Sequence, residues 1–336
     1  MTHRGYPSPV LASLFILAFV ALLLVTDKTQ ALAQGANTAA FGYTSPYSFN
    51  FTCDNLTIGF DASPRNDIGK ESEVDPNDES KDVIPYSDWY DKSNAYYDGS
   101  PPECWGSSCT DKRSYGPKAR LYPRVDAPAG ACDANTWKRE RLIATAQRYL
   151  GYQYQHHYIP DFDPLPIIPD WPSSCPEVKI YYQTAGMSCS TTSTWIYNFG
   201  LGIHRHYFCV SKQAEADTPI GCQRDDNTRG NITPLVIGAG DSYETLVKEL
   251  QTGDLLYIMR ENEDKVDHVI MWVGSVGSDP IEQQPLVIDS HDNSPAIKDA
   301  NGVTIPPGIQ IRPFRKDEFY YQRFSHAHRI VGQPCQ

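Results

Sequence analysis

Nine cysteines in a chain that begins like a secreted protein limit most strongly what this sequence can fold into. In an oxidising compartment cysteines pair into disulfides, so eight can be bridged and one is left over. Eight cysteines allow about 105 pairings, and the sequence does not choose among them, although it favours a local bridge between Cys209 and Cys222. The candidates for bridging are Cys53, Cys104, Cys109, Cys132, Cys175, Cys209, Cys222 and Cys335.

Residues 1–33 have the pattern of a secretory signal peptide. Arg4 gives a basic start, an apolar run extends from Val10 to Val25, and Ala31-Leu32-Ala33 has the small residues that precede a cleavage site. An uncleaved membrane anchor is the alternative. We expect a secreted, extracellular protein with no membrane contact after cleavage, because no later stretch approaches the length of a bilayer span.

The net charge of -12 argues against a nucleic-acid partner, because binding to phosphates requires a basic surface. Three sequons, which begin at Asn50, Asn55 and Asn231, are acceptors for N-glycosylation in a host that glycosylates. We expect a monomer without a cofactor.

Helices are expected to precede strands along this chain. Residues 34–131 are rich in Ser, Pro, Asp, Asn, Gly and Tyr, which indicates a loop-rich, disulfide-containing N-terminal region. In residues 132–336 the pattern predicts a helix from Asn135 or Thr136 to Leu150, and a second helix from a Ser188 cap to Gly200. A polar insertion follows at 204–250. The later strands are Leu255–Met259, Val269–Val273, Leu286–Ser290, Ile309–Ile311 and His328–Val331, and this order predicts an α+β domain with an antiparallel sheet.

Cys189 is the candidate for the unbridged thiol. It follows Ser188 and precedes Ser190 at the expected start of the second helix, where unpaired backbone N–H groups and the helix dipole favour a nucleophilic thiolate. A buried structural thiol is the alternative. A nucleophile also needs a base and a group that orients the base.

His268 is the candidate base, because it stands at the beginning of an apolar strand. Asp289 and His291 lie on the next strand, two residues apart and therefore on one face. Either of them could orient His268. The alternative for His268 is a hydrogen-bonded histidine at a strand end.

These motifs, in this order, resemble those of the NlpC-type secreted cysteine peptidases of bacterial cell-wall turnover, which have a papain-like fold with N-terminal helices packed on a short antiparallel sheet. The matching pieces lie within residues 136–331 and are Leu150-Gly151 with Tyr154, Ser188-Cys189-Ser190, Gly202-Ile203, Thr252-Gly253-Asp254-Leu255, and the run from His268 to Gly274. The resemblance implies an NlpC-like cysteine hydrolase domain at 132–336. It also implies a peptide or peptidoglycan stem peptide as substrate.

Departures from the NlpC pattern keep other functions open. Ser188 replaces the usual Asp, Thr191 replaces a Gly, and the third catalytic residue lies 21 or 23 positions after His268 instead of about a dozen, which an insertion at 275–285 would explain. The expected chemistry is amide hydrolysis, with the start of the helix and the Tyr154 hydroxyl stabilising the oxyanion. The alternatives are a catalytically inactive binding or effector protein on the same scaffold and a CHAP-type amidase or acyltransferase.

Histidine pairs do not indicate a metal site. The pairs His156-His157, His204 with His206, and His326 with His328 have no carboxylate or cysteine beside them at metal-binding spacing. We therefore expect no metal, and we expect these histidines to lie on the surface or along a substrate groove.

Overall fold

The structure is a computed structural model, and it describes residues 43–56, 122–152, 154, 187–205, 210–238, 240–260, 265–292 and 295–336. The chain divides into two compact units, Met1–Thr44 and Ser45–Gln336, and almost everything described belongs to the second unit. The expected signal peptide at 1–33 lies outside the described residues. Among the described helices, none is both long and apolar enough to cross a bilayer.

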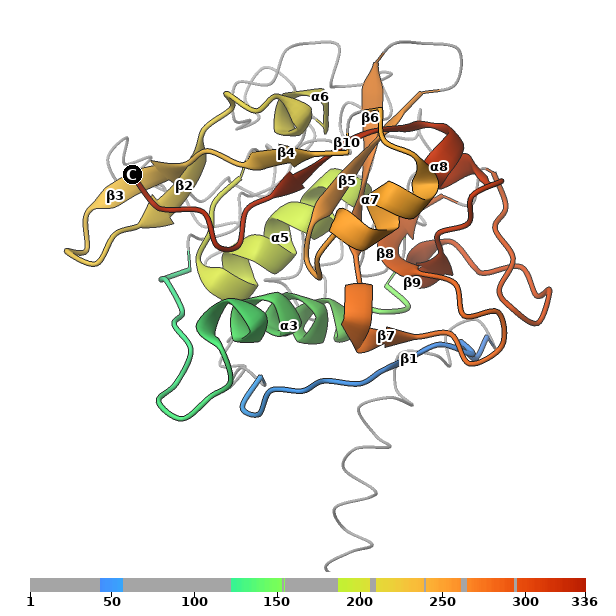
Figure 1. Ribbon diagram of the computed structural model, residues 1–336, viewed down its shortest axis with the longest axis horizontal. Helices are drawn as coiled ribbons and strands as arrows, with labels where there is room; N and C mark the ends of the chain where they lie inside the picture. The colour runs from blue at the N-terminus through green and yellow to red at the C-terminus, as the bar shows by residue number, and fades with distance from the viewer. Residues whose placement is uncertain are drawn as a thin grey trace, which may run out of the picture. The chain divides into compact units, whose positions relative to one another are not determined.

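A six-stranded antiparallel sheet forms the centre of the second unit (Figure 1). Strand β5, in the middle of the sheet, is buried on both faces and is therefore a continuous apolar run rather than an alternating pattern, whereas the buried strand β8 is apolar only in its first half. The strands, in spatial order, are β4 (Leu235–Ile237), β10 (Phe324–Arg329), β5 (Leu255–Met259), β6 (Val266–Trp272), β8 (Leu286–His291) and β9 (Gly308–Pro313).

Two helices, α3 (Ala134–Gln147) and α5 (Cys189–Leu201), lie next to each other in Figure 1 and contact each other. Gly200 allows this close approach, because a Cβ atom at that position would lie 3.1 Å from Oγ1 of Thr145. Helix α5 also contacts β6 and β8. The packing therefore brings the N-terminal half of the second unit against the strands that carry His268 and Asp289.

The helix caps differ in part from those expected. Ser188 caps α5 as predicted, but α3 is capped by Asp133, not by Asn135 or Thr136, because the Asp133 carboxylate accepts hydrogen bonds from the backbone N–H groups of both residues. Helix α5 continues past Gly200 and ends at Gly202, which takes the left-handed conformation (φ 67°) that terminates helices.

The insertion expected at 204–250 contains regular structure. Besides β4, it holds a short two-stranded sheet and two helices, and the remaining short elements lie elsewhere in the chain. These elements are α6 (Val210–Ala214), β2 (Ile220–Gln223), β3 (Arg229–Ile232), α7 (Tyr243–Glu249), η5 (Gly274–Val276), β7 (Gly277–Ser278) and α8 (Phe319–Gln322).

A strap of residues from the N-terminal region crosses below α3 in Figure 1. Its strand β1 (Ser48–Phe49) pairs with β7, and the Cys53–Cys132 disulfide ties it to the residue before the α3 cap. Buried Glu140 of α3 accepts hydrogen bonds from the backbone N–H groups of Thr52 and Cys53 and from the Thr52 hydroxyl. The strap is therefore fixed by a covalent bond, a strand pair and a buried carboxylate.

The second described disulfide corrects the expected local bridge. Cys222 is bonded to Cys335, 113 residues away, and not to Cys209. The bond forms because β3, the neighbour of β2, also pairs with the C-terminal residue Gln336, which brings Cys335 over Cys222. Cys104, Cys109, Cys175 and Cys209 lie outside the described residues.

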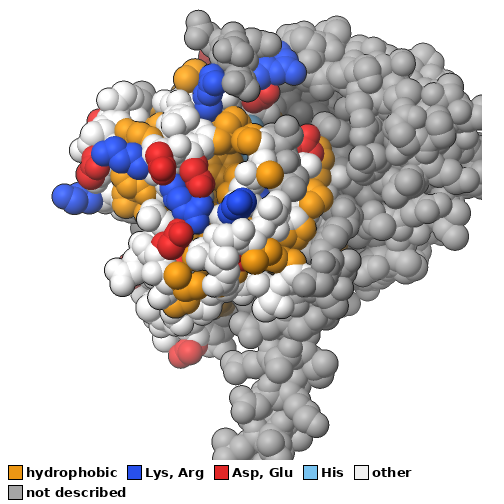
Figure 2. Space-filling model, turned by 90° about the vertical axis from the view of Figure 1, so that its right-hand side faces the viewer, with side chains coloured by type: hydrophobic (Ala, Val, Ile, Leu, Met, Phe, Trp, Pro, Cys, Tyr) orange, Lys and Arg blue, Asp and Glu red, His pale blue; other side chains and the backbone are white. Residues whose placement is uncertain are grey.

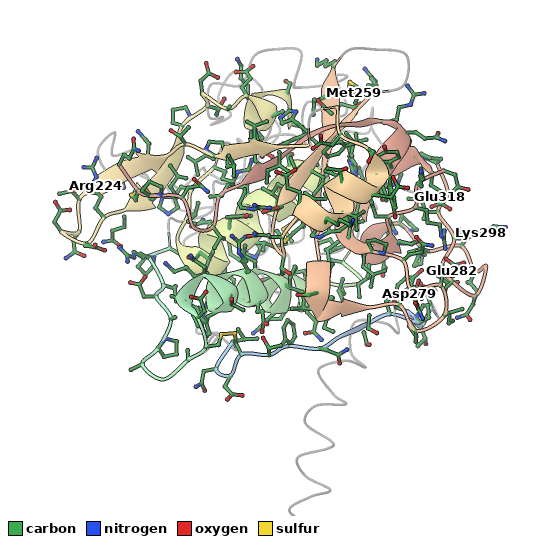
Figure 3. All side chains as sticks on the ribbon, in the orientation of Figure 1. Arg224, Met259, Asp279, Glu282, Lys298 and Glu318 are labelled. Atoms are coloured by element: carbon green, nitrogen blue, oxygen red, sulfur yellow. A yellow bond between two sulfur atoms is a disulfide. The ribbon has the colours of Figure 1, made fainter. Side chains whose placement is uncertain are left out.

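The insertion expected at 275–285 consists of the end of η5, the short strand β7 and a loop that leads to β8. Asp279 holds this loop by accepting backbone N–H bonds from Ile281, Glu282 and Gln284. Figure 3 places Asp279, Glu282, Lys298 and Glu318 on one side of the molecule, where Arg315 pairs with Glu282 and Glu318. Figure 2 shows acidic and basic side chains next to one another on this side, so its charges are locally balanced.

Candidate active site

Cys189 is the first residue of α5, and its side chain is buried. Among the described cysteines it is the free one, because Cys53, Cys132, Cys222 and Cys335 are all bridged. Its thiol therefore lies at the N-terminus of a 13-residue helix, where the dipole and the first backbone N–H groups stabilise negative charge.

Two residues that the sequence did not suggest, Ser290 and Gln213, hold the start of α5 in place. Ser290 of β8 donates a hydrogen bond of 2.5 Å to the backbone carbonyl of Met187, two residues before Cys189. Gln213 of α6 donates to the Ser190 carbonyl at 3.2 Å and to the Thr194 hydroxyl at 3.0 Å. The segment that carries the thiol is thus attached to the sheet on one side and to α6 on the other.

His268 of β6 and Asp289 of β8 meet across neighbouring strands. Their Nε2 and Oδ1 atoms are 2.8 Å apart, and both side chains are buried. The ring N–H is not well aligned with this oxygen, so neither atom completes a hydrogen bond of good geometry. The 2.8 Å separation still brings the two groups together, and catalytic hydrogen bonds are often loosely aligned before a substrate binds.

The pKa values of His268 and Asp289 move apart. Burial is the largest influence on His268 and lowers its pKa, but the charges of Asp289 and Cys189 and hydrogen bonding to both outweigh it, so the pKa is raised well above 6.5. Burial alone would raise the pKa of Asp289, and the opposing effect of His268, supported by His291 and Arg312, lowers it. The geometry therefore favours a charged imidazolium beside the Asp289 carboxylate, the form that His268 takes once it has accepted a proton from the thiol.

The second carboxylate oxygen of Asp289, Oδ2, is bound by two other side chains. The Tyr320 hydroxyl donates a hydrogen bond to Oδ2, and Nε of Arg312 lies 3.5 Å from the same atom. Arg312 is itself buried and donates to the backbone carbonyls of Pro306 and Gly308. These partners leave Oδ1 directed at His268. No local pattern pointed to Tyr320 or Arg312, because they come from α8 and β9, which lie far from Cys189 in the chain.

His291 lies beside the pair but does not bridge to His268. Its ring centroid is 5.2 Å from that of His268 at an interplanar angle of 82°, and its Nδ1 atom is 3.7 Å from Asp292. Burial lowers the pKa of His291, against the charge of Asp289. Of the two residues expected to orient the base, Asp289 is the one in direct contact with it.

The expected oxyanion donors are Tyr154 and the backbone N–H groups at the start of α5. Tyr154 is half-buried, and its role as an oxyanion donor stays a prediction. The backbone N–H groups of Thr191 and Thr192 bond to Ser188, so oxyanion donors at the helix start would have to precede them.

The Gly253-Asp254 turn is structural. Gly253 takes a φ of 87°, and its carbonyl accepts a hydrogen bond from the buried Tyr197 hydroxyl of α5. Asp254 accepts hydrogen bonds of 2.7–3.2 Å from Nε and Nη2 of Arg329, which is also buried. Burial raises the pKa of Asp254, and Arg329 opposes this effect. The turn therefore fixes α5 relative to β5.

The other histidines follow the expectations only in part. His204 contacts the Tyr122 carbonyl through its ring at 3.2 Å, and His326 contacts the Ala214 carbonyl at 2.9 Å. His328 is fully buried against Tyr257, so it is not the surface histidine that we expected. His156, His157 and His206 lie outside the described residues.

Comparison with known proteins shows a weak structural similarity. No protein-family model matches the chain, and no curated protein matches it either. A crystal structure of an NlpC/P60 family protein from Bacillus cereus is similar at 15% sequence identity and a TM-score of 0.32. The alignment covers 64% of this chain and 44% of that chain, so this chain spans less than half the length of that protein.

Proposed function

We propose that this protein is a secreted cysteine hydrolase that cleaves an amide bond. The observation that carries the proposal is the 2.8 Å contact between His268 and the buried carboxylate of Asp289. The two strands that carry them are contacted by α5, the helix that begins at the free thiol of Cys189. Nucleophile, base and orienting group are then in the relation that thiol hydrolysis requires. In the same proposal, the domain has the papain-like fold of the NlpC type.

The proposed reaction follows from these positions. His268 accepts the proton of Cys189, and the thiolate attacks the carbonyl carbon of the amide to form a thioester after the amine leaves. His268 gives its proton to the departing amine, and water then hydrolyses the thioester with His268 acting again as the base. Asp289 keeps the ring oriented and stabilises its positive charge throughout.

A short peptide is the proposed substrate, and the stem of peptidoglycan is the specific candidate. The support is the order of the sequence motifs around Cys189 and His268, together with the helix and strands on which the structure places them. Secretion is proposed from residues 1–33 and from the disulfides. Asn50, Asn55 and Asn231 are exposed and accessible to glycosylation.

A second candidate function has one observation in its favour. Cys189 and His268 are 5% and 9% exposed, so a substrate reaches them only if neighbouring groups move. A binding or effector protein that has kept the scaffold without the reaction would show such a closed site. In that case the thiol would not react with reagents in the folded protein.

The decisive experiment measures thiol chemistry and hydrolysis on the same preparation. Folded protein is treated with a thiol-directed peptide probe and, separately, with defined muropeptides whose products are identified by mass spectrometry. The hydrolase requires labelling at Cys189 and the release of an amine, both absent in Cys189→Ser. Cleavage of a bond outside the peptide would favour a CHAP-type amidase, and acyl transfer to an added amine would favour an acyltransferase. A Cys189 that does not react with the probe would favour the binding protein.

A further inference from the structure

Two histidines and an aspartate at the candidate site have a geometry that suits a transition-metal ion. One ligand atom from each of His268, Asp289 and His291 lies within 4.8 Å of the other two. All three residues are buried, which separates this cluster from the exposed acidic groups that are common on protein surfaces. Imidazole and carboxylate together are ligands that Zn²⁺ and related ions prefer.

The polar atoms of this cluster are also incompletely satisfied. Nε2 of His268 and Oδ1 of Asp289 are buried, and neither completes a hydrogen bond of good geometry despite the 2.8 Å between them. Buried polar atoms without partners are costly, and a cation that both atoms coordinate would remove the cost. The other carboxylate oxygen is occupied by Tyr320 and Arg312, so Oδ1 is the oxygen left for a metal.

We propose that His268, Asp289 and His291 form a binding site for a divalent transition-metal ion such as Zn²⁺, and that the bound ion shuts off thiol chemistry. The ion would bind the His268 nitrogen that faces Asp289 and separate base from carboxylate. Three protein ligands leave a fourth position open for water. Formation of the site requires the three groups to close around the ion, because tetrahedral Zn²⁺ holds its ligands about 2.0–2.2 Å from the metal.

Cys189 is not among the proposed ligands. The Cys189 thiol influences the same imidazole ring, that of His268, as Asp289 does. Because Nε2 of this ring already faces the carboxylate, we infer that the thiol faces the other ring nitrogen. A metal held at Nε2 would therefore have nitrogen and oxygen ligands and no sulfur. This feature distinguishes the proposed site from the simple capture of Zn²⁺ by a reactive thiol.

Isothermal titration of the full chain with Zn²⁺ tests the site. The proposal predicts one ion bound per protein in the wild type and in Cys189→Ser, and affinity at least about tenfold weaker in Asp289→Asn and in His291→Gln. His204→Gln is the matched control, because that ring is bonded to the Tyr122 carbonyl at the opposite end of α5, and it should bind as the wild type does. Absence of binding in the wild type, or its loss in Cys189→Ser, would overturn the proposal.

A spectroscopic measurement on the wild type covers the case in which a variant fails to fold. The Co²⁺-loaded protein should show d–d bands of a low-coordinate site without a sulfur-to-metal charge-transfer band, and such a band would contradict the ligand set. The inference does not depend on hydrolysis, because Zn²⁺ can bind to an inactive protein. Where thiol labelling at Cys189 is detected in the presence of a chelator, one equivalent of Zn²⁺ should suppress it at least about tenfold, and unchanged labelling would refute the shut-off.

Discussion

Nε2 of His268 lies 2.8 Å from Oδ1 of Asp289, and the two residues stand on adjacent antiparallel strands in the middle of the sheet. Strand β6 supplies the imidazole and β8 the carboxylate, while the thiol comes from the helix that contacts both strands. A rigid sheet therefore fixes the base and its orienting group, and the base is aligned with the thiol by helix packing.

Replacement of Cys189 by serine should remove hydrolysis without removing the fold. The change keeps the shape of a small buried side chain at a helix start and deletes the nucleophile. We expect no detectable amine release and a melting temperature within a few degrees of the wild type. A serine variant that still cleaves muropeptides would show that the nucleophile lies elsewhere, and a collapse of the melting temperature would mark a structural thiol.

Replacement of Asp289 by asparagine should slow hydrolysis at least about a hundredfold. The amide cannot stabilise the charged imidazolium, and it also leaves Arg312 and Tyr320 facing a neutral partner. The second effect should cost about 3–5 kcal/mol of unfolding free energy, so activity is compared below the melting temperature of the variant. His291→Gln should slow the reaction less than Asp289→Asn, and the reverse order would assign the third role to His291.

The charge on His268 should make the stability of the protein depend on pH. Because the pKa of folded His268 is raised, its contribution is fully present below the unfolded value of about 6.5 and is lost as the pH rises through the folded value. The lowered pKa of Asp289 contributes above about 3.9 and is lost as the pH falls through its folded value. Urea unfolding of the wild type and of His268→Gln should therefore converge as the pH is raised beyond neutrality.

The control for this comparison is His204→Gln, whose ring contacts the backbone carbonyl of Tyr122. Its difference from the wild type should vary little over the same range of pH. A constant gap between the wild type and His268→Gln from acidic to alkaline pH would contradict the raised pKa.

Loss of the Cys222–Cys335 bridge should destabilise the protein by about 2–5 kcal/mol. The bridge closes a loop of more than a hundred residues, so its removal gives the unfolded chain much new freedom. Paired Cys222→Ser and Cys335→Ser substitutions avoid a stray thiol, and chemical unfolding measures the change. Peptide mapping of the unreduced protein should recover these two cysteines together, whereas a Cys209–Cys222 peptide would restore the local bridge.

Local signals in the sequence predicted the parts of the site that local chemistry determines. Ser188 as a cap, Cys189 at the start of a helix and the strand around Leu255 to Met259 follow from residue preferences and short-range periodicity. The α+β class and the antiparallel sheet follow from the order of such elements.

Features that depend on distant contacts were not predictable in this way. The sequence contains two glycines near the end of α5; Gly200 packs against Thr145 within the helix, and Gly202 takes the left-handed conformation that ends it. The Cys222–Cys335 bridge depends on the pairing of the C-terminus with β3. Tyr320 and Arg312 reach Asp289 from elements whose sequences give no sign of that role.

The rate of alkylation of Cys189 at neutral pH, in the wild type and in His268→Gln, tests the central claim most directly. If His268 accepts the thiol proton, iodoacetamide should modify the wild type at least about tenfold faster than the variant. The measurement is made with a chelator present and with both proteins shown to be folded by circular dichroism. Equal rates would contradict the account, because the thiol would then react without help from the imidazole.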